Sequence, residues 1–166
     1  MCGRNGGMKR GGIYFFFDQD GIVDDYIPYL LNDLIKNIDE LVVVCNGKLS
    51  EEGYKVFKKY AGEIIVRPNE GLDVWAYKAG LSYYGWDKIE EFDELVMLNH
   101  TIMGPVYPFY ETFDKMKDRD IDFWGITKHN RMEEDIFGIN PYGYMPEHIQ
   151  SHFMVFRKKL LCSKEF

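Results

Sequence analysis

Polar side chains that could bind or transfer a charged group stand where four apolar runs of the sequence end. Carboxylates bind cations or accept protons, and amide, imidazole and hydroxyl groups hydrogen-bond phosphates and sugars. The carboxyl ends of parallel strands lie at one edge of a sheet, so we expect these groups to converge on one cleft. The groups are Asp18/Asp20, Asn46, Asn69/Asp73 and Asn99/His100/Thr101.

The stretch of residues 67–81 has the clearest local pattern. Arg67-Pro68 ends the apolar run 63–66, because proline lacks a ladder donor and the residue before it disfavours helix. Gly71 permits a tight turn, and the apolar residues of 74–84 favour a helix. Free N–H groups at such a helix start favour anions, which indicates the rim of a nucleotide or sugar-phosphate pocket. A turn former at Asn69 and a helix cap at Asp73 explain the same residues equally well.

The first polar group has a second interpretation. The run Phe15-Phe-Phe-Asp18-Gln-Asp20-Gly21 resembles the opening motif of haloacid-dehalogenase-type phosphatases, where the first Asp attacks phosphorus, the second moves protons and Mg²⁺ neutralises the phosphate. That scheme needs a later acidic pair at a strand end. The acidic run Glu133–Asp135 follows no apolar strand. A turn capped by Asp18 is the simpler explanation.

Histidines and tryptophans add weaker signals. His100 is predicted to be a hydrogen-bonded turn residue. His148 and His152 are four residues apart, a spacing that suits a metal on a helix, but the residues that follow favour a strand. The three tryptophans are predicted to lie in the core or a pocket wall, with stacking on a sugar or base as an alternative for one of them.

The elements that must position these groups alternate between strand and helix. This alternation predicts an α/β domain, Rossmann-like, with a mainly parallel sheet and helices on both faces. Residues 128–147 are polar and Gly/Pro-punctuated and are predicted to be a long loop. Strands are expected at 12–17, 41–45, 63–66, 92–98, 121–126 and 152–156, and helices at 23–38, 50–61, 74–84 and after Pro108.

Composition limits the class of protein. The 166 residues suffice for one domain with a core, and the net charge of −7 argues against a nucleic-acid binder. Cys2, Cys45 and Cys162 are far apart, so a disulfide framework is not expected and the cytoplasm is the default compartment. No apolar run approaches the ~18 residues of a membrane span. Residues 1–12 lack the apolar core of a signal peptide and are predicted to be a disordered leader.

Four longer motifs occur together in one order. They lie at residues 69–77 (NEGLDVWAY), 98–105 (LNHTIMGP), 122–127 (DFWGIT) and 148–156 (HIQSHFMVF). In this order and spacing, from about Ile13 to Phe166, the chain resembles the rhamnan synthesis F family, which comprises rhamnosyltransferase-like enzymes of bacterial cell-envelope polysaccharide assembly. The resemblance implies a single GT-A-like glycosyltransferase domain over residues 13–166, incomplete at its C-terminus.

The resemblance also implies substrates and site residues. The enzyme would transfer a deoxyhexose from a nucleotide sugar, with dTDP-rhamnose as the expected donor, to a lipid-linked polysaccharide. It would act at the inner face of the cell membrane, with which it could associate peripherally. The acceptor side would include Trp124, Gln150 and Ser151. Donor-binding positions would be Asn69, Gly71, Asp73, Tyr77, Asn99, His100 and Thr101.

One departure from the family concerns the metal. Many relatives have Asn-Asp-Ser where this chain has Asn99-His100-Thr101, so the carboxylate that would hold Mg²⁺ or Mn²⁺ is absent and another acid, such as Asp73, is the candidate ligand. Either Asp73 binds the ion, or the site stabilises the leaving diphosphate without one. The alternative function is a truncated, non-catalytic module that binds a nucleotide sugar.

Overall fold

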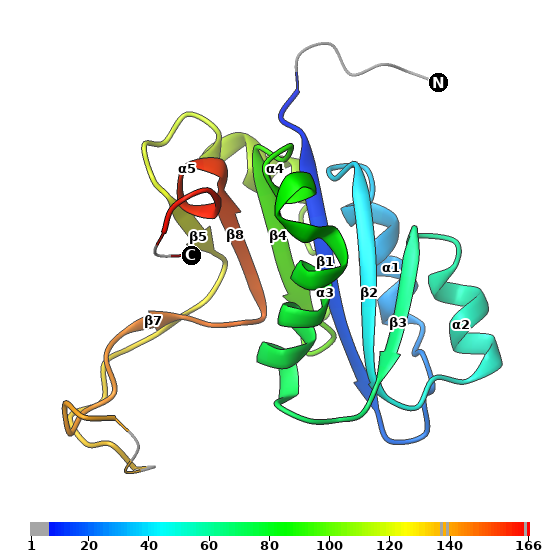
Figure 1. The fold of residues 1–166 in the computed structure, drawn as a ribbon, viewed down its shortest axis with the longest axis horizontal. Helices are drawn as coiled ribbons and strands as arrows, with labels where there is room; N and C mark the ends of the chain where they lie inside the picture. Colours follow the sequence, from blue (N-terminus) through cyan, green and yellow to red (C-terminus); the bar gives the residue numbers. More distant parts are fainter. Residues whose placement is uncertain (1–6, 137, 139, 165) are drawn as a thin grey trace.

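The computed structural model describes residues 7–136, 138, 140–164 and 166, and its centre is a six-stranded sheet (Figure 1). Four of the strands are parallel, and β8 is antiparallel to both of its neighbours. The prediction of a mainly parallel sheet is confirmed. In spatial order the strands are β3 (Glu63–Arg67), β2 (Glu40–Gly47), β1 (Arg10–Asp18), β4 (Glu94–Asn99), β8 (Phe153–Arg157) and β5 (Phe123–Gly125).

Helices cover both faces of the sheet, as the sequence predicts. Successive residues of β1 point to opposite faces, so Tyr14 and Phe16 pack with α1, α2 and α4, whereas Ile13 and Phe15 pack with α3 and α5. Because β1 and β2 are buried from both sides, they are continuous apolar runs without alternation. The helices are α1 (Tyr26–Leu34), α2 (Glu51–Phe57), α3 (Leu72–Ile89), α4 (Phe109–Met116) and α5 (Lys158–Leu161).

Strand β1 begins at Arg10, two residues before the predicted start, so residues 10–12 of the expected disordered leader belong to the sheet. Glycines at this position allow close packing. A Cβ on Gly11 would lie 2.5 Å from the Phe92 ring, and one on Gly12 would lie 2.8 Å from Ile38. Residues 1–6 lie outside the described residues.

Helix boundaries also differ from the sequence pattern. Helix α1 starts at Tyr26 rather than near residue 23, and α3 extends to Ile89 across Gly85, whose φ of 69° breaks the helical geometry. Ser50 caps α2, because its hydroxyl accepts a hydrogen bond from the Gly53 N–H at 3.0 Å.

The described residues between 128 and 149 form a projection that we call the arm. Its base pairs β6 (Lys128–His129) with β7 (His148–Ile149), and a bridge joins Met132 to Met145 further out. The arm leaves the sheet at the edge where the parallel strands end (Figure 1). The predicted long loop is therefore partly paired, because antiparallel contacts across the segment are invisible to local periodicity.

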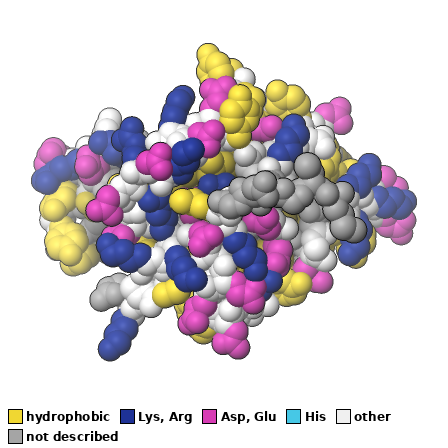
Figure 2. Space-filling model, turned by 90° about the horizontal axis from the view of Figure 1, so that it is seen from above, with side chains coloured by type: hydrophobic (Ala, Val, Ile, Leu, Met, Phe, Trp, Pro, Cys, Tyr) yellow, Lys and Arg dark blue, Asp and Glu magenta, His cyan; other side chains and the backbone are white. Residues whose placement is uncertain are grey.

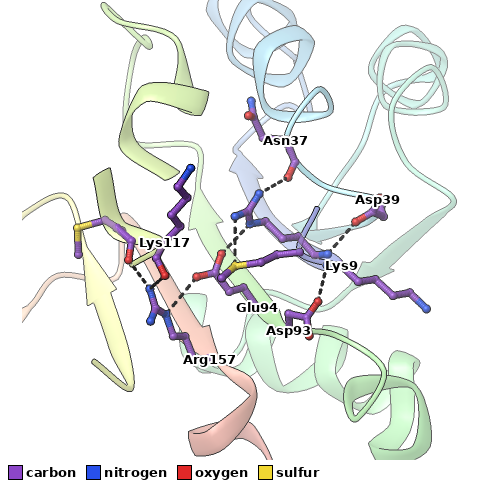
Figure 3. A network of polar contacts seen from close by, with 10 residues as sticks. Lys9, Asn37, Asp39, Asp93, Glu94, Lys117 and Arg157 are labelled. Atoms are coloured by element: carbon purple, nitrogen blue, oxygen red, sulfur yellow. Dashed lines mark hydrogen bonds and ion pairs between the residues drawn. The ribbon is translucent and has the colours of Figure 1, made fainter. Parts of the chain in front are cut away.

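A buried carboxylate organises the opposite edge, where the parallel strands begin. Glu94 is 1% exposed and accepts from Arg10 Nε at 2.6 Å and from Arg157 Nε at 3.3 Å (Figure 3). The Arg157 guanidinium also donates to the backbone carbonyls of Met116 and Arg119. This network ties β1, β4 and β8 to the segment after α4.

The surface at that edge carries interspersed basic and acidic side chains, with no large patch of one sign (Figure 2). Among the described residues, no helix combines the length and the apolar character needed to cross a bilayer. Cys45 is buried and Cys162 exposed, and both are free thiols, while Cys2 lies outside the described residues.

Candidate functional site

Two of the four predicted polar groups, Asn69/Asp73 and Asn99/His100/Thr101, meet at the carboxyl ends of β1 and β4. The chain builds β2 and β3 on one side of β1 and then crosses to build β4 on the other, so this is the topological switch point of the sheet. A cavity of about 320 Å³ opens there, and we call it the strand-end pocket. It is lined by Phe15, Phe17, Asn69, Leu72, Asp73, Asn99, His100, Thr101, Ser151 and His152.

Asn46 fixes the turn that brings Asn69 and Asp73 to the pocket. Its side chain is fully buried at the end of β2; Nδ2 donates to Asn69 Oδ1 at 3.2 Å and to the Leu72 carbonyl at 3.0 Å. Its Oδ1 accepts from Arg67 Nη1 at 2.6 Å. Because every one of these contacts is internal, Asn46 and Arg67 position the turn rather than line the cavity.

Gly71 is the residue on which the start of α3 depends. It has φ 65°, a left-handed conformation that glycine adopts without steric cost, and a Cβ there would lie 2.1 Å from the Trp75 ring. No side chain caps the helix, so its first N–H groups have no side-chain partner. Trp75 covers the turn and is 52% exposed, which differs from its predicted place in the core or a pocket wall.

Three side chains form a directed hydrogen-bond chain along one wall of the pocket. The Thr101 N–H donates to Asn99 at 3.0 Å, which identifies the accepting atom as Oδ1. The Thr101 hydroxyl donates to the same oxygen at 2.5 Å, and its Oγ1 lies 2.9 Å from His152 Nδ1. Since the hydroxyl hydrogen is already used, His152 must donate from Nδ1. Its Nε2 then carries a lone pair in the neutral ring.

His100 lines the pocket with a neutral ring. The His100 backbone N–H donates to the Phe15 carbonyl at 3.0 Å, and its ring packs edge-on against Phe15 and Phe16, with centroid distances of 5.5 and 5.8 Å. Burial lowers the pKa of the imidazole, against smaller opposing effects of the Phe15 backbone and of Asp18. Within the described part of the chain, the buried Nδ1 has no hydrogen-bond partner. A ligand that offers a donor or acceptor would satisfy it.

Tyr77 joins α3 to the segment before β8. Its hydroxyl donates to the Ser151 carbonyl at 2.7 Å, and the same carbonyl accepts from Asn99 Nδ2 at 3.4 Å. Burial raises the pKa of the phenol, with a further contribution from Asp73, so Tyr77 stays a neutral donor. Its hydroxyl is therefore occupied, and Tyr77 is placed to position the wall that Ser151 forms.

A second cavity of about 620 Å³ lies beyond Tyr77, between α3 and the segment that includes β7 and β8. Its lining is mainly apolar and includes Leu81, Met97, Met154 and Phe156, together with Gln150 and Ser151. Ser151 and His152 border both cavities, so these two residues form a wall that the cavities share.

Several predicted residues do not line the strand-end pocket, among them Asp18, Asp20 and Trp124. Asp18 is a turn cap whose Oδ1 accepts from the N–H groups of Asp20 and Ile22 at 2.9 and 2.8 Å, and Asp20 is exposed. The Ile22 bond in particular lowers the pKa of Asp18. Trp124 is only 4% exposed and packs against Phe113 in the core, so its side chain cannot border an acceptor at the surface. That prediction fails because β5 turns the ring inward.

The pocket lining contains a single carboxylate, that of Asp73. Throughout the described residues, no three His, Cys, Asp or Glu side chains lie together as a metal-binding group. Mg²⁺ is commonly held by one or two carboxylates together with substrate phosphates. Asp73 therefore fits an ion that arrives with a phosphorylated ligand, and the pocket does not fit a metal centre made by protein groups alone.

His152 is the site residue that sequence reasoning missed. In the sequence it invites pairing with His148, whereas in the structure it bonds Thr101 across the end of β4. The sequence signal that could have identified His152 is its position one residue before an apolar strand. Because this strand, β8, is antiparallel to β4, its start lies at the same edge of the sheet as Asn99.

The model of one protein family, rhamnan synthesis protein F, matches residues 41–166. The match covers more than half of the 166 residues, so the chain belongs to the rhamnan synthesis protein F family. The resemblance carried by the four motifs is confirmed. Of the pocket residues, Phe15 and Phe17 alone lie outside the matched range. No curated protein sequence matches the chain significantly.

Three of the solved structures that match the chain share little sequence identity with it. Core-mannan synthase A from Aspergillus fumigatus, in its Mn/GDP form, has 9% identity and a TM-score of 0.42 over 99% of this chain and 63% of its own. A candidate nucleotide-diphospho-sugar transferase from Desulfovibrio desulfuricans G20 has 17% identity and a TM-score of 0.43 over 91% and 65%. The S. cerevisiae mannosyltransferase Ktr4p in complex with GDP has 11% identity and a TM-score of 0.41 over 94% and 58%. The chain thus spans less than two thirds of each neighbour, and these scores assign no residue role to it.

Proposed function

We propose that this chain is the donor-binding part of a GT-A-like glycosyltransferase that moves a deoxyhexose, rhamnose, from dTDP-rhamnose to a lipid-linked cell-envelope polysaccharide. The observation that carries the proposal is the strand-end pocket, where polar groups from three strand ends meet at the switch point of the sheet. Family membership supports the substrate class. The proposal also includes a cytoplasmic position at the inner face of the membrane, where the protein would reach a lipid-linked acceptor.

The donor would lie with its charged part against the start of α3. The helix N-terminus offers N–H groups without a side-chain cap, and Asn69 and Asp73 stand beside it. Thr101 and His100 would face the diphosphate or sugar, and Asn99 would hold Thr101 in place. Tyr77 would keep Ser151 in position rather than bind the donor, and Gln150 and Ser151 would face the acceptor from the second cavity.

The pocket lining includes no lysine or arginine. An anionic donor therefore needs another source of positive charge, and we infer that Mg²⁺ or Mn²⁺ enters with the diphosphate and is held by Asp73. When bound, the ion would neutralise the charge that develops on the leaving diphosphate. The protein groups would orient the donor and exclude water from it.

His152 is the residue we propose as proton acceptor for the attacking hydroxyl. Its Nδ1–H is tied to Thr101, which leaves Nε2 free, and its side chain borders both cavities. A neutral imidazole that is held in one tautomer is suited to this role. His152→Gln should then lower the transfer rate while donor affinity changes little.

A thermal-shift titration with dTDP, dTDP-rhamnose and UDP, each with and without Mn²⁺, tests the donor site. A ligand that binds the folded state at about 100 times its Kd stabilises it by roughly 2.7 kcal/mol. We expect a dTDP-selective shift that grows with Mn²⁺ and is lost in Asp73→Ala. Asp87→Ala is the matched control, because Asp87 is an exposed carboxylate of the same helix outside the pocket lining.

Absence of a shift with every nucleotide would refute the proposal. If the nucleotide-dependent thermal shift is lost equally in the Asp73 and Asp87 variants, the loss reflects the stability of the helix and not binding in the pocket. Binding without sugar transfer to any acceptor would favour the alternative, a non-catalytic nucleotide-sugar-binding module.

The phosphatase interpretation has less support. Asp18 is engaged as a turn cap, and no group of three acidic or histidine side chains gathers near it among the described residues. If it is nevertheless correct, Asp18→Asn should abolish hydrolysis of p-nitrophenyl phosphate. The glycosyltransferase proposal expects no such activity in the unsubstituted protein.

A further inference from the structure

The second cavity has apolar walls that three elements supply. On α3, Val74, Tyr77 and Leu81 recur at helical spacing and line the cavity. On the sheet, Met97 of β4 lies directly opposite Met154 of β8, so both methionines point to the same face. Unbranched methionine side chains adapt to flexible apolar ligands. The volume of about 620 Å³ is in the range of small-molecule sites.

The polar and the aromatic residues of this cavity lie at opposite ends. Helix α3 and strand β8 both start at the edge of the sheet where the parallel strands end, and both run away from it (Figure 1). Gln150, Ser151 and His152 precede β8 and therefore lie at that edge, where the last two also line the strand-end pocket. Phe156 lies further along β8 and packs against Phe166, with ring centroids 5.4 Å apart.

A lysine adds positive charge to the polar end of the cavity. Among the described lining residues, Lys78 is the one lysine or arginine, and none of them has a side-chain carboxylate. Lys78 is exposed, and no described carboxylate forms an ion pair with it. It follows Tyr77, whose hydroxyl bonds the Ser151 carbonyl, and the Cα–Cβ bonds of a helix tilt toward its N-terminus. The charge therefore favours an anionic group on the side of the strand-end pocket.

We propose that this cavity binds a single-chain lipid phosphate, with the phosphate at Lys78 and the apolar chain between α3 and β8. A soluble phosphate would leave the apolar walls in contact with water. An apolar chain without a head group would leave Lys78 without a counter-charge. A chain that ends in a phosphate satisfies both parts of the cavity at once, and its head group points toward the strand-end pocket.

The lipid would be part of the acceptor, so this site rests on the proposed function and gives it a substrate class. Ser151 and His152 border both cavities, which places the phosphate at Lys78 close to the sugar that is transferred. Few sugars would then stand between the lipid phosphate and the attacking hydroxyl. We expect the acceptor to be a short lipid-linked glycan, supplied by an enzyme that transfers the first sugars to the lipid phosphate.

Calorimetry with n-octyl phosphate, n-decyl phosphate and n-decyltrimethylammonium, each below its micelle concentration, tests the cavity directly. One decyl phosphate should bind per chain, and each CH₂ between octyl and decyl should tighten binding about fourfold. The cationic ligand should bind more weakly, because Lys78 repels its head group. With ¹³C-labelled methionine methyl groups, the NMR signals of Met97 and Met154 should shift on binding, whereas that of Met8, before the start of β1, should not.

Two variants separate the head group from the chain. Lys78→Gln should weaken decyl phosphate by up to about fivefold, as for an exposed ion pair, and should not weaken decyltrimethylammonium. Lys59→Gln is the matched control, because Lys59 is an exposed lysine outside the cavity lining. Leu81→Trp should fill the apolar part and weaken both ligands about tenfold.

Several results would overturn the proposal. These are no saturable binding of decyl phosphate up to about 1 mM, affinity that ignores chain length, or unchanged affinity in Leu81→Trp. A stable dimer that Leu81→Arg dissociates would overturn it in favour of a second copy of the chain on this face. A dTDP-dependent thermal shift without decyl phosphate binding would overturn the lipid site and leave the donor site supported. Decyl phosphate binding that responds to both variants, without any nucleotide shift, would support the lipid site while the proposed function fails.

Discussion

Replacing Glu94 by glutamine should destabilise the protein more than any change to a surface charge. The carboxylate is 1% exposed and holds two guanidinium groups, and the Arg10 and Arg157 side chains are themselves 12% and 16% exposed. Glutamine keeps the shape but removes the charge. Two nearly buried cations would then lack a counter-charge.

The magnitude follows from the burial of this network. Removing one partner of a buried ion pair costs about 3–5 kcal/mol, because the remaining charge is left uncompensated in a poorly solvated site. At roughly 2–4 °C per kcal/mol for a chain of this size, the melting temperature should fall by about 6–20 °C. Urea unfolding followed by circular dichroism gives the free energy directly, provided that the slope with denaturant is unchanged.

Glu91→Gln is the matched control. Glu91 also contacts two basic groups, Lys9 at 2.5 Å and Lys88 at 3.2 Å, but its side chain is 51% exposed. Solvent screens such pairs, so the control should unfold within error of the unsubstituted protein. If Glu94→Gln loses less than about 1 kcal/mol, or no more than Glu91→Gln, the buried network does not stabilise the sheet as argued.

Three further predictions concern the site and the helix that carries it. Gly71→Ala should cost roughly 1–2 kcal/mol from its left-handed φ, plus displacement of Trp75, and thermal unfolding with tryptophan fluorescence should report both effects. Gly80→Ala should also destabilise the protein, because the added Cβ would lie 2.6 Å from Ile13. The overpacking costs about 1–3 kcal/mol and outweighs the ~1 kcal/mol gained in helix propensity. A variant more stable than the unsubstituted protein would contradict this packing. In the folded state the pKa of His100 is lowered from 6.5. The stability that depends on its neutral ring is therefore fully present above about pH 6.5 and is lost as the pH falls through the lower, folded-state pKa. His100→Gln should therefore lose less melting temperature than the unsubstituted protein between about pH 7 and 5, and parallel curves would argue against a buried neutral ring.

Much of the site could be predicted because it is made of strand ends. Asn69, Asp73 and Asn99 follow apolar runs that can only be buried strands, and parallel strands deliver their carboxyl ends to one edge. Gly71 was predicted as a turn glycine from its neighbours, and its positive φ confirms that role. These inferences need local pattern and topology alone.

Contacts between distant segments could not be predicted in this way. His152 reaches Thr101 because β8 returns antiparallel to β4. Trp124 faces the core because of the register in which β5 pairs with β8, and a neighbouring register would turn it to the opposite face of the sheet. A shift of one residue would expose the ring. The pairing of His129 with His148 likewise depends on the register of β6 and β7, two strands of two residues each that carry no periodic pattern.

The sequence by itself determined the α/β alternation, the parallel core of the sheet and the edge at which polar groups gather, because burial of apolar runs and the stereochemistry of glycine and proline act over a few residues. The tertiary structure decided which side chains touch. It placed Glu94 between two arginines, gave His152 a fixed tautomer and stacked His129 on His148. Those outcomes depend on strand order and register, which are set by packing across the whole sheet and leave no local periodic signal in the chain.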